Sequence, residues 1–399
     1  MKKKVVIGLS GGVDSSVAAW VLKEQGYEVS GLFMKNWHDN TGVLEGDCSA
    51  EDDLMFAEMV ARKLDIPFYK VDLSEPYRKR VLDYMFSEYK AGRTPNPDIL
   101  CNREIKFDSF VREAVRLGAD LVATGHYCRK ETISPGRMEI HRLLSGTDRN
   151  KDQSYFLCQI TQDQLAGAYF PIGNMTKPEV RKLASDLQLP TADRKDSQGI
   201  CFIGKVDLPS FLQQQLKPRT GRTVLIPADT DFPVYRKGLP GDDTPDEKLL
   251  EISSPYLYNP SAGPTIGKHK GAHFFTVGQR KGINIGGYKE PLFILATDCN
   301  KNIIYAGEGQ DHPGLYRKGL MINDKDIHWI RPDLVMKEGE TREYDVRIRY
   351  RQPLERAKLF RRSSGMFIIF DSLQRGIAPG QFAAWYTGDE LLGSGVINS

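Results

Sequence analysis

The beginning of the chain constrains the fold more than any other segment. An apolar run suited to a β-strand, Val5 to Leu9, passes through Ser10-Gly11-Gly12 into residues typical of a helix start, Val13 to Ser16. Paired glycines allow backbone conformations and close approaches that a Cβ atom would block, and the free amides at a helix start attract anions. We therefore predict a strand, a phosphate-binding loop and a helix, the first unit of an α/β domain that binds a nucleotide.

This loop differs from the common P-loop. It lacks the lysine of GxxxxGK[ST], so the γ-phosphate contact of kinases and GTPases is missing. Ser-Gly-Gly-Val-Asp-Ser-Ser at 10–16 instead resembles the pyrophosphate loop of N-type ATP pyrophosphatases, which cleave ATP between the α and β phosphates and leave AMP on a substrate. A glycine turn that only joins a strand to a helix is the alternative, and the whole heptad disfavours it.

Length and composition narrow the class of protein. The 399 residues suffice for two or three domains, and with 40% hydrophobic and 27% charged residues the composition is ordinary. No apolar run approaches the ~20 residues of a membrane span, and no cleavage site follows the lysines at 2–4, so we expect a cytoplasmic protein. A net charge of +3 does not by itself indicate a nucleic-acid partner, and six cysteines without a CxxC pair disfavour a disulfide framework or structural zinc.

Strand-like and helical segments alternate through the first third of the chain. Strand-like runs at 5–9, 28–34, 68–73 and 121–124 alternate with helical stretches at 15–25, 51–64, 77–91 and 105–117. This pattern predicts a doubly wound parallel sheet, with the ligand beyond the carboxyl ends of the strands. From about Val206 the runs shorten and turn residues multiply, so we predict a catalytic domain at 1–206, a small central domain at 207–288 and a C-terminal β-barrel at 289–399.

Two cysteines lie in contexts that favour a reactive thiol. Cys101 follows the prolines of 94–97, and we expect it on a restrained loop before a helix, where a thiolate would be stabilised. Cys201 lies between glycines and follows the basic pair at 194–195, which would also lower its pKa. Local composition alone leaves a reactive thiol and a buried small hydrophobe equally open for both cysteines.

Uncommon strings elsewhere point to one family. The loop at 10–16 is followed, in order, by Asn-Pro-Asp-Ile-Leu-Cys-Asn at 96–102, Thr-Gly-His-Tyr at 124–127, Lys-Asp-Gln-Ser-Tyr-Phe-Leu at 151–157 and Asp-Ser-Gln-Gly-Ile-Cys-Phe-Ile-Gly at 196–204. Together they resemble the tRNA-specific 2-thiouridylase family over nearly the whole chain. The resemblance implies an ATP pyrophosphatase domain of the adenine nucleotide α-hydrolase type, a small central domain and a C-terminal β-barrel. It also implies ATP-dependent 2-thiolation of the wobble uridine (U34) of tRNA.

The implied chemistry assigns roles to three residues. Adenylation of uracil O2 turns a poor leaving group into AMP and releases diphosphate. By the resemblance, Cys201 carries the incoming sulfur as a persulfide, and Cys101 is the nucleophile that attacks the sulfur of Cys201. Asp98 is the implied acid/base beside them. Without the resemblance, a carboxylate that only caps the loop would be the better reading of Asp98.

The resemblance also implies binding residues. ATP is assigned to Gly8, Leu9, Ser10, Gly11, Gly12, Val13, Asp14, Ser15, Met34 and Gly125, with Mg²⁺ expected on the phosphates but no motif that fixes its ligands. The flipped uridine and the rest of the tRNA are assigned to Asn96, Pro97, Asp98, His126, Lys151, Asp152, Gln153, Arg349, Tyr350 and Gln381. The implied partners are tRNAs of the Lys, Glu and Gln types and a sulfur donor, either a cysteine desulfurase or a persulfide relay protein.

A basic segment near the C-terminus offers a surface for tRNA. Residues 342–362 hold eight Arg or Lys against three acids. Between 345 and 351 arginines alternate with apolar residues, which predicts a strand with Arg347, Arg349 and Arg351 on one face. That face would bind phosphates, and Tyr350 could stack on a base. A merely solvated strand face is the alternative.

Two features depart from the family pattern, and two other functions compete. Residues 231–262 look like an insertion in the central domain, and Cys128 adds a third thiol near the site, which we interpret as packing. One competing function is an ATP-dependent ligase that adenylates a small metabolite without RNA. The other is an RNA-binding module in which Asp98, Cys101 and Cys201 hold an iron–sulfur cluster, although no compact cysteine motif supports it.

Overall fold

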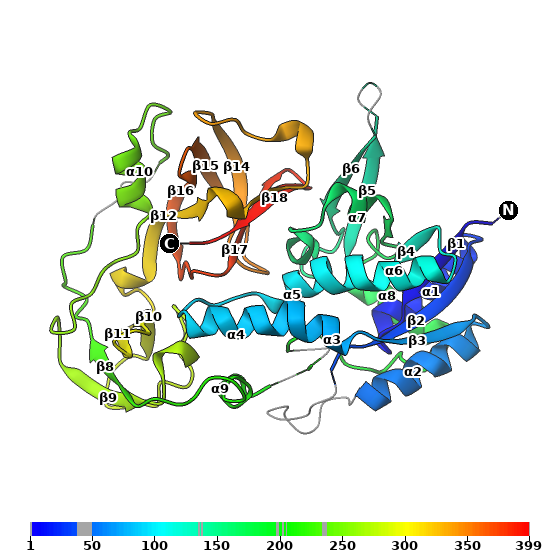
Figure 1. The fold of residues 1–399 in the computed structure, drawn as a ribbon, viewed down its shortest axis with the longest axis horizontal. Coiled ribbons are helices and arrows are strands. Elements are labelled where there is room, and N and C mark those ends of the chain that lie inside the picture. The colour runs from blue at the N-terminus through cyan, green and yellow to red at the C-terminus, as the bar shows by residue number, and fades with distance from the viewer. Residues whose placement is uncertain are drawn as a thin grey trace.

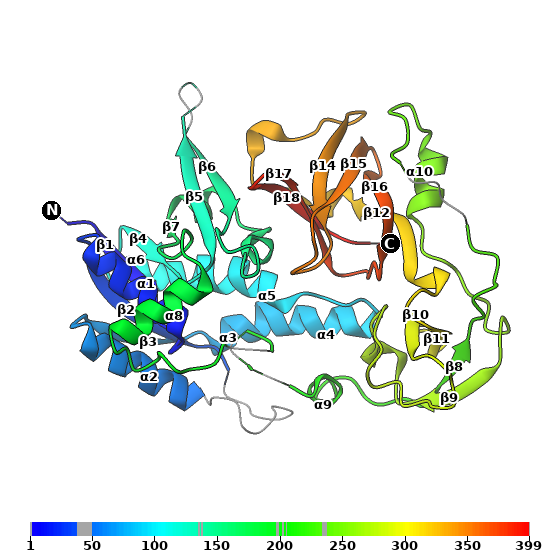
Figure 2. The ribbon, with the colours of Figure 1, turned by 180° about the vertical axis from the view of Figure 1, so that it is seen from behind.

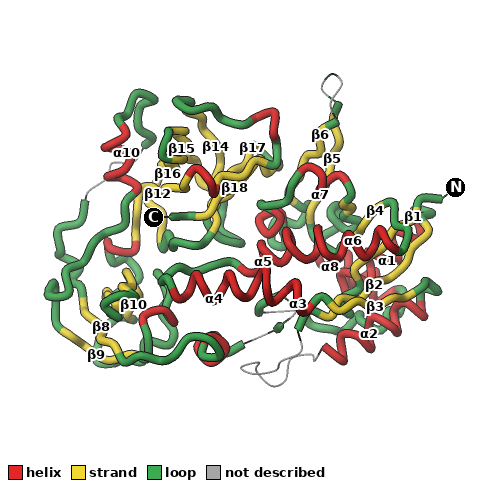
Figure 3. Tube along the Cα trace, viewed as in Figure 1, coloured by secondary structure: helices red, strands yellow, loops and turns green. Residues whose placement is uncertain are grey.

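Three β-sheets organise the chain, as Figure 1 shows for the computed structural model. The structure describes residues 2–37, 50–134, 136, 139–196, 199–201, 203–204, 206–233 and 238–398. Helices gather around the parallel sheet of the N-terminal part, while the rest of the chain is mostly strand and loop (Figure 3). Among the described helices, none combines the length and the apolar character needed to cross a bilayer.

The N-terminal sheet is parallel, in the order β3-β2-β1-β4-β7. Its strands are β1 (Lys4–Gly8), β2 (Glu28–Lys35), β3 (Phe68–Asp72), β4 (Leu121–Ala123) and β7 (Ala168–Tyr169). Val5 and Ile7 pack with α1 (Val13–Glu24), α2 (Ala50–Lys63) and α8 (Lys177–Asp186), whereas Val6 packs with helices of the opposite layer. Because successive side chains of a strand point to opposite faces, both faces are buried, and the predicted doubly wound α/β fold is confirmed.

The opposite layer consists of two long helical runs, each with a π-helical section. The first contains α3 (Ser74–Tyr77), the π-helix Arg78–Leu82 and α4 (Asp83–Lys90); the second contains α5 (Pro97–Leu100), the π-helix Cys101–Ser109 and α6 (Phe110–Arg116). The predicted loop at Cys101 is therefore wrong. The Asn96 side chain accepts a hydrogen bond from the amide of Ile99, and Pro97 suits the first helical position, so the helix begins before the cysteine.

A four-stranded sheet forms the middle of the chain, in the order β10-β11-β8-β9. It contains β8 (Gly221–Leu225), β9 (Thr265–His269), β10 (Leu292–Asp298) and β11 (Ile303–Glu308), and α9 (Leu208–Leu212) precedes it. The β10–β11 hairpin agrees with the sequence pattern, but β11 pairs with β8 and buries Ile303 against Val224. Residues 292–308, which we assigned to the barrel, therefore belong to the central sheet.

The C-terminal sheet is antiparallel, in the order β12-β16-β15-β14-β17-β18-β6-β5, and curls into a barrel (Figure 2). Its own strands are β12 (Tyr316–Asn323), β13 (Ile327–Trp329), β14 (Thr341–Arg347), β15 (Glu355–Arg362), β16 (Gly365–Arg375), β17 (Phe382–Thr387) and β18 (Glu390–Val396). A hairpin of the N-terminal part, β5 (Cys128–Ile133) and β6 (Ile140–Ser145), extends this sheet, since Leu391 of β18 pairs with Leu143. Our sequence analysis assigned no strands to the hairpin.

The predicted insertion packs against the barrel. Its helix α10 (Asp246–Ser253) places Leu249 and Ile252 on Phe360, Phe367 and Ile369 of the barrel strands. Residues 234–237 of the insertion lie outside the described part of the chain. The remaining helices are α7 (Gln162–Ala166) and the 3₁₀ turns Ser154–Leu157, Ala272–Phe274, Pro313–Leu315, Asp324–Asp326 and Pro332–Leu334.

Candidate active site

The glycine loop lies where β1 ends and α1 begins. Gly12 is the N-cap of α1 and has no side chain to occupy the first amides of the helix, and the Ser15 hydroxyl accepts a hydrogen bond from the amide of Ser10. Gly11 has φ +73°, and a Cβ there would lie 2.2 Å from the carbonyl oxygen of Asp53. At Gly125, after β4, a Cβ would lie 2.8 Å from the amide nitrogen of Ser15. Both glycines are thus required by close backbone approaches that shape an anion-binding loop.

Adenine contacts would come from the same edge of the sheet. Met34 lies near the carboxyl end of β2 and is buried, and its methyl carbon would be 3.7 Å from a Cβ at Gly8. Gly8 itself ends β1, and Leu9 is buried directly after it. The predicted ATP residues therefore converge at the carboxyl ends of neighbouring parallel strands, the position at which doubly wound sheets bind ligands.

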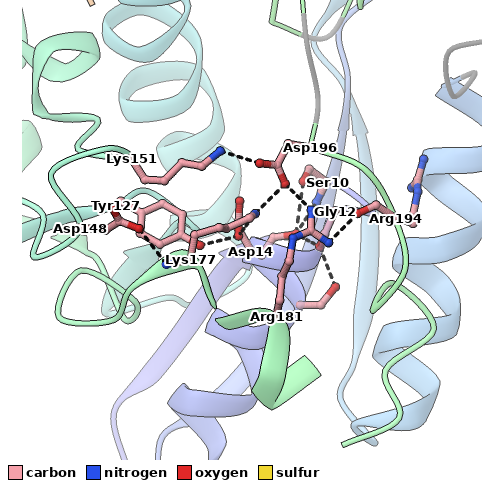
Figure 4. A network of polar contacts seen from close by, with 12 residues as sticks. Ser10, Gly12, Asp14, Tyr127, Asp148, Lys151, Lys177, Arg181, Arg194 and Asp196 are labelled. Carbon is pink, nitrogen blue, oxygen red and sulfur yellow. Dashed lines mark hydrogen bonds and ion pairs between the residues drawn. The ribbon is translucent and has the colours of Figure 1, made fainter. Parts of the chain in front are cut away.

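A network of charges surrounds the loop (Figure 4). Lys177, which is buried, lies 2.7 Å from Asp14 and 2.8 Å from Asp196, and Asp196 also pairs with Lys151 at 2.6 Å and Arg181 at 2.7 Å. Burial alone would raise the pKa of Asp196, but hydrogen bonds from Lys151 and Lys177 hold it well below its ordinary range. Lys151, Lys177 and Arg181 therefore lie beside the loop. There the phosphates of a nucleotide could replace Asp196 as the partner of these cations.

One further cation contacts the loop from the far end of the network. Arg194 donates to the carbonyl oxygen of Gly11 at 2.6 Å and pairs with Asp53 at 2.7 Å. From the sequence we interpreted Arg194 only as a neighbour of Cys201, and we predicted no role for Lys177, Arg181 or Asp196. No motif spacing joins these residues to the loop, because only the fold brings residues 177–196 back to it.

The described residues provide no ready-made metal cage. Among them, no group of three or more His, Cys, Asp or Glu side chains is arranged to hold a metal ion. The carboxylates of Asp14, Asp53 and Asp196 are each paired with a lysine or an arginine. Among the described residues, these carboxylates therefore form no protein site for Mg²⁺.

The second part of the site brings together Asp98, Cys101 and Cys201. An oxygen of the Asp98 carboxyl accepts a hydrogen bond from the amide of Cys201 at 2.9 Å, and the Tyr77 hydroxyl donates to the carbonyl oxygen of Cys201 at 2.8 Å. The side chains of Cys101 and Cys201 interact, and both cysteines are free. Ser197, Gln198 and Phe202 of the same string lie outside the described residues. Two thiols separated by 100 positions in the sequence thus form one contact pair.

The two thiols differ in exposure and acidity. Cys101 is completely buried, and burial raises its pKa well above the ordinary thiol value. Cys201 is partly exposed; the hydrogen bond from Cys101 lowers its pKa, burial opposes this, and the charge of Lys106 lowers it further. The stabilisation of a thiolate that we expected at Cys101 conflicts with this complete burial inside the helical layer. The prediction of a lowered pKa agrees with the structure at Cys201, although Lys106 supplies the charge.

Asp98 and the two unpredicted neighbours complete the thiol site. Burial raises the pKa of Asp98, which brings this carboxyl closer to the range in which it can exchange a proton with a thiol. Tyr77 and Lys106 were missed by our sequence analysis, since a tyrosine and a lysine in helical segments carry no local signal. Cys128 is fully buried in a different apolar cluster from Cys101, which agrees with its interpretation as packing.

Several protein residues that we predicted to contact tRNA form contacts that hold loops of the protein together. His126 is buried, hydrogen-bonds Thr124 at 2.8 Å and packs beside Phe107 and Phe170, and burial keeps its pKa well below the ordinary value. The Gln153 side chain accepts from the amide of Tyr127, and the Gln381 side chain donates to the carbonyl oxygens of Thr94 and Pro95. Contact of these residues with tRNA stays a prediction.

The basic strand is shorter than we predicted. β14 ends at Arg347, which is buried, pairs with Asp152 at 3.2 Å and lies over the Tyr386 ring. The predicted single face through residue 351 is therefore wrong, because the chain turns and Arg351 adopts φ +63°. Arg349 and Arg351 are exposed, whereas Tyr350 packs against Phe156 with ring centroids 4.4 Å apart.

Comparisons with known proteins cover almost the whole chain. Family models described as the tRNA methyl transferase HUP domain, the tRNA methyl transferase PRC-barrel domain and the aminomethyltransferase β-barrel domain match residues 3–205, 247–308 and 319–397. A protein of Flavobacterium johnsoniae is 55% identical and one of Christiangramia forsetii is 56% identical, each over 99% of this chain and 100% of the relative. A protein of Shouchella clausii is 43% identical over 100% of this chain and 98% of the relative. All three relatives are named tRNA-specific 2-thiouridylase MnmA.

Proposed function

The chain belongs to the tRNA-specific 2-thiouridylase family, and from this membership we propose that it replaces the 2-oxygen of the wobble uridine of tRNA by sulfur at the expense of ATP. The observation that carries the proposal within the structure is the pairing of Cys101 and Cys201 beside Asp98. Both cysteines belong to the same apolar cluster as Met34, which lies near the carboxyl end of β2, the strand beside β1 and the ATP loop. Activation and sulfur transfer can therefore occur at one substrate position.

The ATP loop and its cations would perform the activation. The amides at the start of α1 would bind the diphosphate part of ATP, and Lys177 and Arg194 would neutralise its charge. Attack of uracil O2 on the α-phosphorus forms the O2–P bond and releases diphosphate. The former carbonyl oxygen then departs as part of AMP in the next step, which makes substitution at C2 feasible.

The thiol pair would supply the sulfur. The Cys201 thiolate accepts the outer sulfur of a donor persulfide, and Cys101 then attacks the Cys201 sulfur, so that the outer sulfur leaves as hydrosulfide and adds to C2. Asp98 takes the proton of Cys101 in this step. The two cysteines lose two electrons and form a disulfide, the transferred sulfur gains them, and a two-electron thiol reductant resets the site.

Four finer assignments belong to the same proposal. We place the Mg²⁺ of ATP on the phosphates, without a step of its own, because the carboxylates of Asp14, Asp53 and Asp196 beside the loop are each paired with a cation. The sulfur donor is a cysteine desulfurase or a persulfide relay protein that reaches the partly exposed Cys201. The substrates are tRNAs of the Lys, Glu and Gln types. The reaction takes place in the cytoplasm.

The test is a nucleoside assay. The purified protein is incubated with ATP, Mg²⁺, a persulfide source and unmodified tRNA of the Glu type, and the digested nucleosides are analysed by mass for 2-thiouridine. We expect 2-thiouridine only with ATP, and none from Cys201→Ser or Cys101→Ala. The absence of 2-thiouridine together with AMP release that does not require tRNA would reject the proposal in favour of a small-molecule ligase.

A further inference from the structure

Three cations meet at the carboxylate of Asp196 (Figure 4). Lys151 lies 2.6 Å from this carboxylate, Arg181 2.7 Å and Lys177 2.8 Å. Lys151 comes from the loop before the 3₁₀ turn Ser154–Leu157, whereas Lys177 and Arg181 come from α8. Among the described residues, these cations are the only side chains or amides that bind the carboxylate. Asp196 is therefore held in place by charge alone.

Two of the cations have supports that do not depend on Asp196. Lys177 also pairs with Asp14 at 2.7 Å, and Arg181 donates a hydrogen bond to the carbonyl oxygen of Arg194 at 3.1 Å. Both cations belong to α8, which fixes their backbone. Lys177 and Arg181 would therefore stay in position if the carboxylate of Asp196 moved away.

The cations lie beside the phosphate-binding loop and within reach of solvent. Asp14 belongs to the first turn of α1, directly after the loop, and Arg194, two residues before Asp196, donates to the carbonyl oxygen of Gly11 at 2.6 Å. The side chains of Lys151 and Asp196 are 26% and 30% exposed. An anion bound by the loop amides can therefore reach the cations that Asp196 occupies.

Two other carboxylates lie beside Lys177, and both have further donors. Asp14 accepts a hydrogen bond from the Tyr127 hydroxyl at 2.7 Å, and Asp148 accepts one from the backbone amide of Lys177 at 2.9 Å. Asp196 lacks such support among the described residues, and its lysine partners hold its pKa well below the ordinary range, so it stays ionised. Asp196 is therefore the carboxylate that an incoming anion displaces.

We propose that Asp196 is an intramolecular competitor of the diphosphate part of ATP: it occupies the three cations in the empty site, yields them to the β and γ phosphates, and takes them back when diphosphate leaves. This inference rests on the proposed function and assigns Asp196 a role in it. Diphosphate carries more charge and more acceptor oxygens than a carboxylate, so it can win the cations. A tethered carboxylate acts at a high effective concentration, so it lowers the affinity for diphosphate. The exchange forms and breaks no covalent bond.

The experiment is a calorimetric titration of the full chain with inorganic diphosphate. Asp196→Asn keeps the size of the side chain and removes its charge, so the cations become available without a competing anion. We expect this variant to bind diphosphate about tenfold more tightly than the wild-type protein. Diphosphate should also inhibit 2-thiouridine formation by the variant at about tenfold lower concentration. If Asp196 only held the cations together, its loss would weaken binding.

A control and a second variant complete the test. Asp186→Asn removes the exposed partner of Lys182 on the same helix and should leave the affinity for diphosphate unchanged. Asp196→Ala should also bind diphosphate more tightly, and acetate, which supplies the missing carboxylate, should reverse this gain when chloride at equal ionic strength does not. Equal or weaker binding by either folded variant of Asp196 would overturn the proposal, as would a gain in Asp196→Ala that acetate leaves intact.

The outcome is distinguishable from failure of the proposed function, because diphosphate binding requires neither tRNA nor the thiols. Tighter binding by Asp196→Asn, in a protein that forms no 2-thiouridine, would reject the function and keep the competition. Formation of 2-thiouridine by the wild-type protein, without tighter binding in the variant, would reject the competition while the function stood.

Discussion

Asp98 performs two tasks within one side chain. One oxygen of its carboxyl accepts the amide of Cys201 and so fixes the position of that cysteine, while burial raises the pKa of the group. An asparagine can still accept the same amide hydrogen bond but cannot take a proton. We therefore expect Asp98→Asn to bind ATP and tRNA and to lose thiolation by about 10²–10⁴-fold in a single turnover with preloaded persulfide. A loss of less than about threefold would contradict the assigned proton transfer.

The thiol site also shows which of its residues could be predicted from the sequence and which could not. Asp98, Cys101 and Cys201 could be predicted because uncommon strings surround them, whereas Lys106 and Tyr77 could not. Their contribution depends on a π-helical register and on the packing of two helical runs, and neither leaves a pattern in neighbouring residues. We expected a lowered pKa at both thiols, and the structure supports it only at Cys201, because the burial that raises the pKa of Cys101 cannot be read from neighbouring residues.

At the scale of elements, the end of β4 supports the ATP loop through Gly125. A Cβ at this position would lie 2.8 Å from the amide nitrogen of Ser15 and 2.9 Å from the carbonyl carbon of Asp14, so Gly125→Ala must push the loop away. Overpacking of this kind costs about 1–3 kcal/mol, and we expect ATP to bind roughly tenfold more weakly by calorimetry. Gly167→Ala is the control, because a Cβ there meets nothing within 4 Å. Equal ATP affinity in both variants would refute the role of the close approach.

The arginine that ends β14 is buried, whereas the two arginines that follow the strand are exposed. Arg347 is buried against Asp152, while Arg349 and Arg351 are exposed beyond the strand. We expect Arg349→Ala with Arg351→Ala to weaken tRNA binding and to reduce the slope of log K against log salt by about one per arginine. Arg347→Met should instead lower the melting temperature. An unchanged salt slope in the double variant would place the tRNA phosphates elsewhere.

The strands and helices that could be predicted well are those in which buried apolar residues recur at a regular spacing. The strands and helices of the parallel sheet follow their apolar periodicity, because both faces of that sheet are covered. The alternation of arginines with apolar residues in 345–351 led to a wrong prediction. Such a pattern does not show where a strand ends or which side chains form an ion pair with a neighbouring segment. The hairpin of β5 and β6 was missed because its partner strand, β18, lies about 250 positions later in the sequence.

At the scale of the whole molecule, this hairpin joins the nucleotide-binding part to the barrel. Glu390 of β18 is buried and pairs with Arg331 and with Arg142 of β6, and Arg129 of β5 pairs with Asp389. The loop that bears the predicted tRNA residues 151–153 is held to the barrel by the pair of Asp152 and Arg347. The nucleotide-binding part and the barrel are therefore held together by ion pairs between distant segments, of which the pair of Asp152 and Arg347 is buried on both sides.

Loss of the ion pairs between the hairpin and the barrel should destabilise the protein. Glu390 bridges Arg331 and Arg142, and these arginines keep Asp333 and Glu131 as partners. We therefore expect Glu390→Gln to lower the free energy of unfolding by about 1–3 kcal/mol, the cost of leaving buried donors without an acceptor. Glu343→Gln removes the partner of Arg356 in a largely exposed pair and should cost about 0.2–1 kcal/mol. Denaturant unfolding of both variants measures the difference. Equal losses would mean that the pairs of Glu390 contribute no more to stability than an exposed pair.

In the proposed mechanism the two thiols have different tasks, with Cys201 as carrier and Cys101 as nucleophile. The most direct measurement follows one sulfur atom. The protein is loaded with a persulfide, ATP and tRNA are added, and the cysteine peptides and nucleosides are weighed before and after. We predict that one sulfur first resides on the peptide of Cys201 and then appears in 2-thiouridine, and that Cys101→Ser keeps it on Cys201. Sulfur found first on Cys101, or transferred normally by Cys101→Ser, would contradict the account.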